Sequence, residues 1–152
     1  MAGDLLGLAK PCEAKPEIFR IISWDIPRQI HDCLINTRNI FGIYFCCPWF
    51  SRPDIPGFTT LLRDKVRGKV FEVLTRPKEE GPWHEEMLNF FRQECNAKIY
   101  ISPTLHAKLY IIIAQVGSFA IFGSPNLTKA SRSNLEMAIL TFDKSFIDRL
   151  FN

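Results

Sequence analysis

Short runs of β-branched and aromatic residues, separated by helix-like segments, constrain the fold of this chain most. Residues 40–47 are almost entirely apolar, as in a central strand that is buried on both faces. Residues 70–75 form a second such run, and a helical pattern at residues 58–67 lies between the two, with Gly68 as its stop. Strands that alternate with helices favour an α/β fold whose sheet is partly parallel.

The rest of the chain continues this order. Further strands are expected at residues 18–24, 97–102 and 135–142. Further helices are expected at residues 27–38, where Pro27 suits the first turn, at 83–95, and at 143–151, where Asp143 is the cap. The connecting loops are expected at residues 53–57 and 76–82. We therefore expect an α/β fold with a mixed β-sheet sandwiched between helices.

Two apolar runs near the middle of the chain predict a β-hairpin. They are residues 109–113 and 118–122, and a turn at residues 115–117 separates them. Because residues i and i+2 share a face of a strand, His106 and Lys108 should project together just before the hairpin, and Ser124 and Asn126 just after it. Four polar groups would then converge at one end of a buried hairpin, where phosphate chemistry is plausible.

The length of 152 residues suits one domain with a real core. Residues 1–16 contain Gly3, Gly7, Pro11 and Pro16 and are expected to form an arm or irregular lead-in. Residues 17–152 are then the single folded domain.

The distribution of charge along the chain is more informative about its partners than the net charge of +3. From Cys95 through Leu135 the chain has no Asp or Glu but four basic residues: Lys98, Lys108, Lys129 and Arg132. Such a positive region around the hairpin favours a polyanionic partner, although ordinary fluctuation of surface charge is the alternative.

Cysteine usage and hydropathy indicate a cytoplasmic protein without a membrane partner. The five cysteines are odd in number and form no C-x-x-C pair, which is typical of reduced, mostly buried thiols, and they offer no zinc motif. The first residues lack the basic and long apolar regions of a secretory signal. The most apolar stretch, residues 40–50, is too short to cross a bilayer.

Three motifs together resemble the signature of the phospholipase D superfamily: His106-x-Lys108, Gly123-Ser124-x-Asn126-Leu127-Thr128 and Asn134-x-Glu136. Residues 45–49 (FCCPW) and 70–75 (VFEVLT) are similar to early strands of that family, so the resemblance runs from about residue 27 to 142. One departure is Ile113, which stands where the family motif has an aspartate.

The resemblance implies a phospholipase D-like catalytic domain that breaks phosphodiesters without a metal or other cofactor. His106 would attack phosphorus and form a phosphohistidine intermediate. Lys108 and Asn126 would hold the non-bridging oxygens, and Ser124 would add a hydrogen bond. Glu136 would accept a hydrogen bond from the other ring nitrogen of His106 and so orient the ring. As alternatives, His106 could be a strand-end histidine, Ser124 and Asn126 could serve the turn alone, and Glu136 could be an exposed strand residue.

The family uses two such motifs in each active site, whereas this chain has one. Neither His31 nor His84 is followed two residues later by lysine, and we expect His84 on a helix surface without a role. The resemblance therefore implies a homodimer in which a second copy completes the site.

The favoured function is a nuclease of this superfamily that cleaves nucleic acid, DNA rather than RNA. Further substrate contacts are expected from Thr128, Lys129, Arg132 and Trp49, although the two basic residues could be merely solvated. Trp49 and Trp83 could be core aromatics instead of stacking platforms for bases. A phospholipid phosphodiesterase or phosphatidyl transferase, or a non-catalytic nucleic-acid-binding module of the same fold, are the alternative functions.

Overall fold

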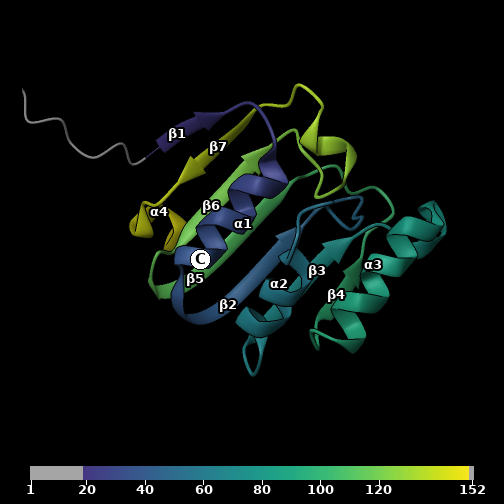
Figure 1. The fold of residues 1–152 in the computed structure, drawn as a ribbon, viewed down its shortest axis with the longest axis horizontal. Coiled ribbons are helices and arrows are strands. Elements are labelled where there is room, and N and C mark those ends of the chain that lie inside the picture. Colours follow the sequence, from purple (N-terminus) through teal and green to yellow (C-terminus); the bar gives the residue numbers. More distant parts are fainter. Residues whose placement is uncertain (1–18, 151–152) are drawn as a thin grey trace, which may run out of the picture.

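The computed structural model describes residues 19–150, and a mixed seven-stranded sheet runs through this part of the chain (Figure 1). The strands are β1 (Phe19–Ile22), β2 (Arg38–Cys46), β3 (Val70–Thr75), β4 (Lys98–Ile101), β5 (Leu109–Val116), β6 (Phe119–Gly123) and β7 (Ala138–Thr141). The helices are α1 (Ile26–Asn36), α2 (Phe58–Val66), α3 (Pro82–Gln93) and α4 (Lys144–Arg149), with short 3-10 turns at Lys78–Glu80 and Ala130–Arg132. The expected α/β fold is confirmed.

The sheet has a parallel half and an antiparallel half. In the order β1-β7-β6-β5-β2-β3-β4, the strands β2, β3 and β4 are parallel to one another, and every other pairing is antiparallel. The hairpin predicted from the two apolar runs is confirmed as β5 and β6. The turn lies later than expected, because β5 extends to Val116 and only residues 117 and 118 separate the strands. Strand β5 joins the halves, because it pairs with β6 on one side and with β2 on the other.

The main hydrophobic core lies on one face of the sheet. Alternate residues such as Phe45 and Ile112 point into it, and α1, α2 and α3 contribute buried side chains such as Ile30, Leu62 and Phe91. On the other face, Ile147 of α4 packs in a smaller cluster with Ile111 and Ala120. The helices therefore cover the two faces unequally, three on one and the short α4 on the other.

The expected start of the last strand differs from the structure, whereas the cap of the final helix is as expected. The last strand begins at Ala138, not at residue 135, because residues 136 and 137 make hydrogen bonds to Ser124 instead of continuing the ladder. The final helix begins after Asp143, whose side chain accepts a hydrogen bond from Phe146 N at 3.1 Å, so the predicted cap is confirmed. The expected arm at residues 1–16 lies outside the described residues.

Gly123 marks a close approach of two strands at the end of the hairpin. A Cβ atom there would lie 2.6 Å from Cα and 2.9 Å from Cβ of Ala138, and it would also press on the carbonyl oxygen of Met137. Only glycine lets β6 and β7 pair at this point.

We expect Gly123→Ala to lower the free energy of unfolding by about 1–3 kcal/mol, because the added methyl group must push β7 away. Urea denaturation measures the change. Gly57→Ala is the control for backbone strain alone, since Gly57 also has a positive φ, of 78°, but no atom within 4 Å of the added Cβ. A Gly123→Ala protein as stable as wild type would contradict the steric argument.

Candidate functional site

The predicted site residues lie at the open end of the β5–β6 hairpin. His106 and Lys108 directly precede β5, and Ser124 directly follows β6. A hydrogen bond from Gly123 N to Lys108 O, 3.2 Å long, closes the hairpin and brings these two short segments together. Sequence reasoning placed His106 and Lys108 on one strand face, but no strand of the described chain includes them, nor Ser124 and Asn126. The ladder stops here because Pro125 has no N–H with which to extend it.

Ser124 is fixed against the loop that leads into β7. Its backbone N donates to Met137 O at 2.9 Å, its Oγ accepts from Met137 N at 3.0 Å, and its Oγ donates to Glu136 Oε2 at 2.5 Å. The carboxylate of Glu136 therefore binds Ser124, whereas sequence reasoning expected it to bind His106. The His106 side chain is exposed and makes no hydrogen bond or ion pair within residues 19–150.

The side chain of Asn126 is held by a buried thiol, that of Cys47. Cys47 Sγ lies 3.3 Å from Asn126 Oδ1 and 3.0 Å from Trp49 O. Burial raises the pKa of the Cys47 thiol to about 11, so it is protonated at neutral pH and can donate to either oxygen. With Oδ1 directed at Cys47, the amide Nδ2 of Asn126 is the end that can donate to an anionic ligand.

Tyr110 supports the same turn. Its side chain is fully buried, and its hydroxyl donates to Pro125 O at 2.9 Å. Burial, together with the neighbouring Cys47, raises the pKa of Tyr110 well above its usual value, so the hydroxyl stays a donor. The Ser124–Asn126 turn therefore rests on two neutral buried groups, neither of which sequence reasoning singled out.

A groove of about 810 Å³ adjoins this turn and includes Asn126 in its lining. Trp49, Thr128 and Lys129, three of the four residues expected to contact substrate, also line it. The ammonium of Lys129 forms an exposed ion pair with Asp54, 3.4 Å away.

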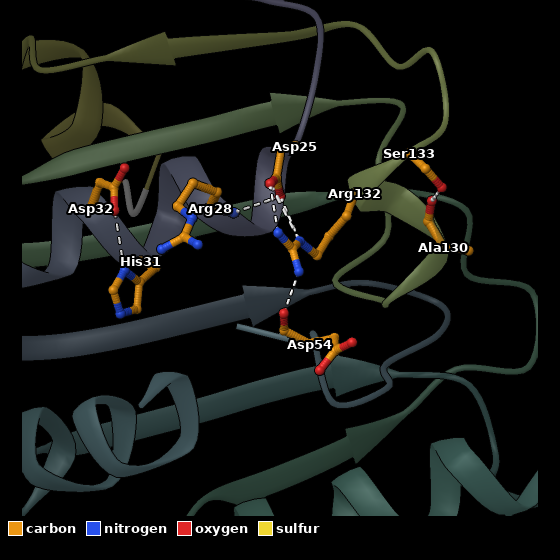
Figure 2. A network of polar contacts seen from close by, with 8 residues as sticks. All are labelled: Asp25, Arg28, His31, Asp32, Asp54, Ala130, Arg132 and Ser133. Carbon is orange, nitrogen blue, oxygen red and sulfur yellow. Dashed lines mark hydrogen bonds and ion pairs between the residues drawn. The ribbon is translucent and has the colours of Figure 1, made fainter. Parts of the chain in front are cut away.

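Arg132, the fourth of these residues, does not line the groove. It connects the loop after Asn126 to the start of α1 (Figure 2). Its guanidinium makes a two-pronged contact with Asp25, with Nε 3.2 Å from Oδ1 and Nη2 3.2 Å from Oδ2. A further donor reaches the carbonyl oxygen of Asp54. Asp25 also caps α1 by accepting from Arg28 N, and it does so in the left-handed region, at φ 40°. This conformation costs a non-glycine residue about 1–2 kcal/mol, which the paired contacts offset.

The expectation that His84 lies on a helix surface is wrong. The ring is fully buried: Nδ1 accepts from Phe50 N at 3.1 Å, and Nε2 lies 3.1 Å from Arg76 O. Phe50 in turn forms a parallel bridge with Leu127, next to Asn126. The spacing of His84, Met87, Leu88 and Phe91 places all four on one helix face, and this was the signal for burial.

Residues 19–150 offer neither a cluster of metal ligands nor a membrane-spanning helix. No group of three or more His, Cys, Asp or Glu side chains there could hold a metal ion. In the same residues, no helix is long and apolar enough to cross a membrane. The cysteines of this segment, Cys33, Cys46, Cys47 and Cys95, are free thiols.

Comparison with known proteins relates this chain to one family. A family model described as the phospholipase D-like domain of cardiolipin synthase matches residues 35–152. A comparison with the curated proteins finds no match.

Solved structures share the fold at low sequence identity. NucT from Helicobacter pylori has a TM-score of 0.65 at 13% identity, covering 88% of this chain and 90% of NucT. Nuc, a phospholipase D family member from Salmonella typhimurium, has a TM-score of 0.62 at 17% identity, covering 88% and 89%. Polyphosphate kinase from Porphyromonas gingivalis has a TM-score of 0.61 at 15% identity, and the chain spans only 25% of its length.

The Asp25–Arg132 contact predicts a strong energetic coupling. In a double-mutant cycle with Asp25→Asn and Arg132→Met, we expect a coupling energy of at least about 1.5 kcal/mol, because the hydrogen bonds are charge-assisted and partly buried. Urea denaturation of the four proteins measures it. The exposed helix pair Lys144–Asp148 serves as the control and should couple by less than about 0.5 kcal/mol. Equal coupling in both pairs would contradict the anchoring role of Arg132.

Proposed function

Because this chain belongs to the phospholipase D-like family, whose model matches residues 35–152, we propose that it is a metal-independent phosphodiesterase that cleaves nucleic acid. The observation that carries the proposal is the meeting of His106, Lys108, Ser124 and Asn126 at one end of the hairpin. The imidazole of His106 is exposed and so accessible to a phosphodiester, and Lys108 and Asn126 lie on the two segments that the Gly123–Lys108 hydrogen bond brings together.

In the first half of the reaction, a ring nitrogen of His106 attacks phosphorus. A P–N bond forms, and the P–O bond to the leaving sugar oxygen breaks. Lys108 Nζ and Asn126 Nδ2 bind the non-bridging oxygens and stabilise the charge of the five-coordinate phosphorus. Cys47 and Tyr110 hold the turn that carries Asn126, so its amide is in place before substrate arrives.

A second histidine has to supply the proton that the leaving oxygen takes up. In the second half, the same histidine, now neutral, takes a proton from water, whose oxygen attacks phosphorus and breaks the P–N bond. His31 and His84 are buried, His84 with both ring nitrogens hydrogen-bonded, so neither is available. We infer that the second histidine is His106 of another copy in a homodimer. One ring then acts as the nucleophile while the other acts as the acid.

The rim of the site offers a surface for that second copy. Leu135 and Met137 flank Glu136 and are 93% and 66% exposed. Large apolar side chains at such exposure are typical of residues that a partner covers. A two-fold axis beside this loop would bring the two His106 residues toward each other.

The substrate is inferred from charge. Residues 95–135 carry no carboxylate, and among their basic residues Lys98 and Lys108 form no ion pair within the described chain. This surplus of positive charge suits the closely spaced phosphates of a nucleic acid, and we favour DNA over RNA. Free thiols among the described residues are typical of a reducing compartment, and we propose the cytoplasm.

A substrate panel tests the activity. DNA, RNA and phospholipid vesicles are incubated with the protein in excess EDTA, and we expect cleavage of nucleic acid. Cleavage of lipid alone would instead assign the alternative function, a phospholipid phosphodiesterase or phosphatidyl transferase. Activity that EDTA abolishes and Mg²⁺ restores would overturn the metal-free mechanism.

Substitutions at the motif should remove turnover without unfolding the protein. We expect His106→Ala and Lys108→Met each to lower kcat at least about a hundredfold, since they remove the nucleophile and a charge that stabilises the transition state. Lys144→Met, on the distant α4, is the matched control for charge and should stay close to wild type. Unchanged cleavage by His106→Ala would reject His106 as the nucleophile.

If two copies share a site, activity depends on protein concentration. We expect the specific activity to fall on dilution below the dimer dissociation constant, and sedimentation velocity to show dimers turning into monomers over the same range. Leu135→Asp should shift both curves to higher concentration, because it places a charge in the interface. A strict monomer with full activity would contradict the shared site.

A further inference from the structure

The groove beside Asn126 has two tryptophans in its lining, although the reaction itself uses neither. Trp49 follows β2, and Trp83 lies in the first turn of α3. Trp83 is 44% exposed. Asn126, Thr128 and Lys129, from the segment that follows β6, also line the groove. Large indole surfaces that remain accessible beside a reactive centre can stack on flat ligands.

A chain of contacts connects the aromatic groove to the nucleophile. The guanidinium of Arg76 lies 4.9 Å from the ring centroid of Trp49, and its Nε donates to Leu105 O at 2.9 Å. Leu105 directly precedes His106. Arg76 therefore links Trp49 in the groove to the residue that precedes His106.

The position of Trp83 depends on a glycine. A Cβ atom at Gly81 would lie 2.9 Å from both Cε2 and Nε1 of the Trp83 indole. The absence of a side chain lets the ring lie close to the backbone at the start of α3, which orients it.

Two cations, Arg52 and Lys129, line the same groove, and each forms a weak ion pair with a carboxylate. Arg52 lies 3.6 Å from Glu86, and Lys129 lies 3.4 Å from Asp54, with all four side chains at least 59% exposed. Exposed pairs of this kind contribute about 0–1 kcal/mol, so both cations can exchange their carboxylates for phosphates at little cost. The groove thus offers indole rings for bases and cations for the backbone.

We propose that this groove binds unpaired bases, and that the protein therefore prefers single-stranded nucleic acid to duplex. The proposal rests on the nucleic acid substrate proposed above. In a duplex, neighbouring bases cover one another's faces, whereas an unpaired base can stack on an indole. The groove volume of about 810 Å³ falls within the range of about 300–1,000 Å³ for small-molecule pockets. Such a volume is large enough for one nucleotide.

The test measures binding by fluorescence anisotropy with the non-cleaving His106→Ala protein as background. The probes are a labelled 15-nucleotide single strand, its duplex, and vesicles of anionic phospholipid. We expect the single strand to bind more tightly than the duplex. Adding Trp83→Ala should weaken single-strand binding about 5- to 100-fold and duplex binding much less, because one stacking contact is lost. Trp83→Phe should recover most of the loss, and Gly81→Ala should weaken binding although the indole is retained.

Trp24→Ala is the matched control, because Trp24 is also exposed but lies outside the groove, and binding should not change. Equal affinity for single strand and duplex, or no effect of Trp83→Ala on their ratio, would overturn the proposal. Binding of vesicles alone, lost in Trp83→Ala, would assign the groove to lipid instead. Hydrolysis of a small chromogenic phosphodiester by the wild-type protein reports the chemistry separately, so that failure of the groove and failure of the proposed activity are distinguishable.

Discussion

The antiparallel pairing of β2 with β5 is the contact on which the site depends. Its register sets Cys46, the last residue of β2, opposite Leu109, the first of β5. The segments that follow β2 and precede β5 therefore meet at one edge of the sheet, which puts Cys47 close to the His106–Lys108 segment. Strand β3, parallel to β2, ends at the same edge and delivers Arg76 there. One pairing thus gathers residues that lie some sixty positions apart in the chain.

Local patterns were enough to predict most of the elements. Runs of β-branched residues predicted β2 and β3, and the turn expected at residues 115–117 predicted the hairpin. These signals depend only on neighbours in sequence. The motif residues were proposed from sequence, and the hairpin explains why the segments that carry them come together. The prediction wrongly extended strands through His106 and through Leu135. The ladder of backbone hydrogen bonds ends earlier, because Pro125 lacks an N–H and because residues 136 and 137 bond to Ser124. The periodicity of apolar residues does not reveal either cause.

Contacts between segments that lie far apart in the chain could not be predicted from the sequence. Nothing local shows that Arg132 pairs with Asp25, 107 positions earlier, or that Glu136 binds Ser124. The buried supports were missed for a related reason: Cys47 and Tyr110 looked like ordinary apolar strand residues, and their polar atoms gain a role only beneath the Ser124–Asn126 turn. A buried polar atom must find a partner, and that partner is set by the tertiary fold.

The anchoring of Arg132 defines how much chain a working unit needs. The segment that matches the family model begins at residue 35, after most of α1, whereas Asp25 caps the start of that helix. A fragment cut to the family boundary would keep every motif residue and yet lose the carboxylate that holds the loop after Asn126. It would also lose β1, the neighbour of β7. The minimal stably folded fragment is therefore longer than the segment that the family model matches, because residues before that segment hold the loop after Asn126 and the edge of the sheet.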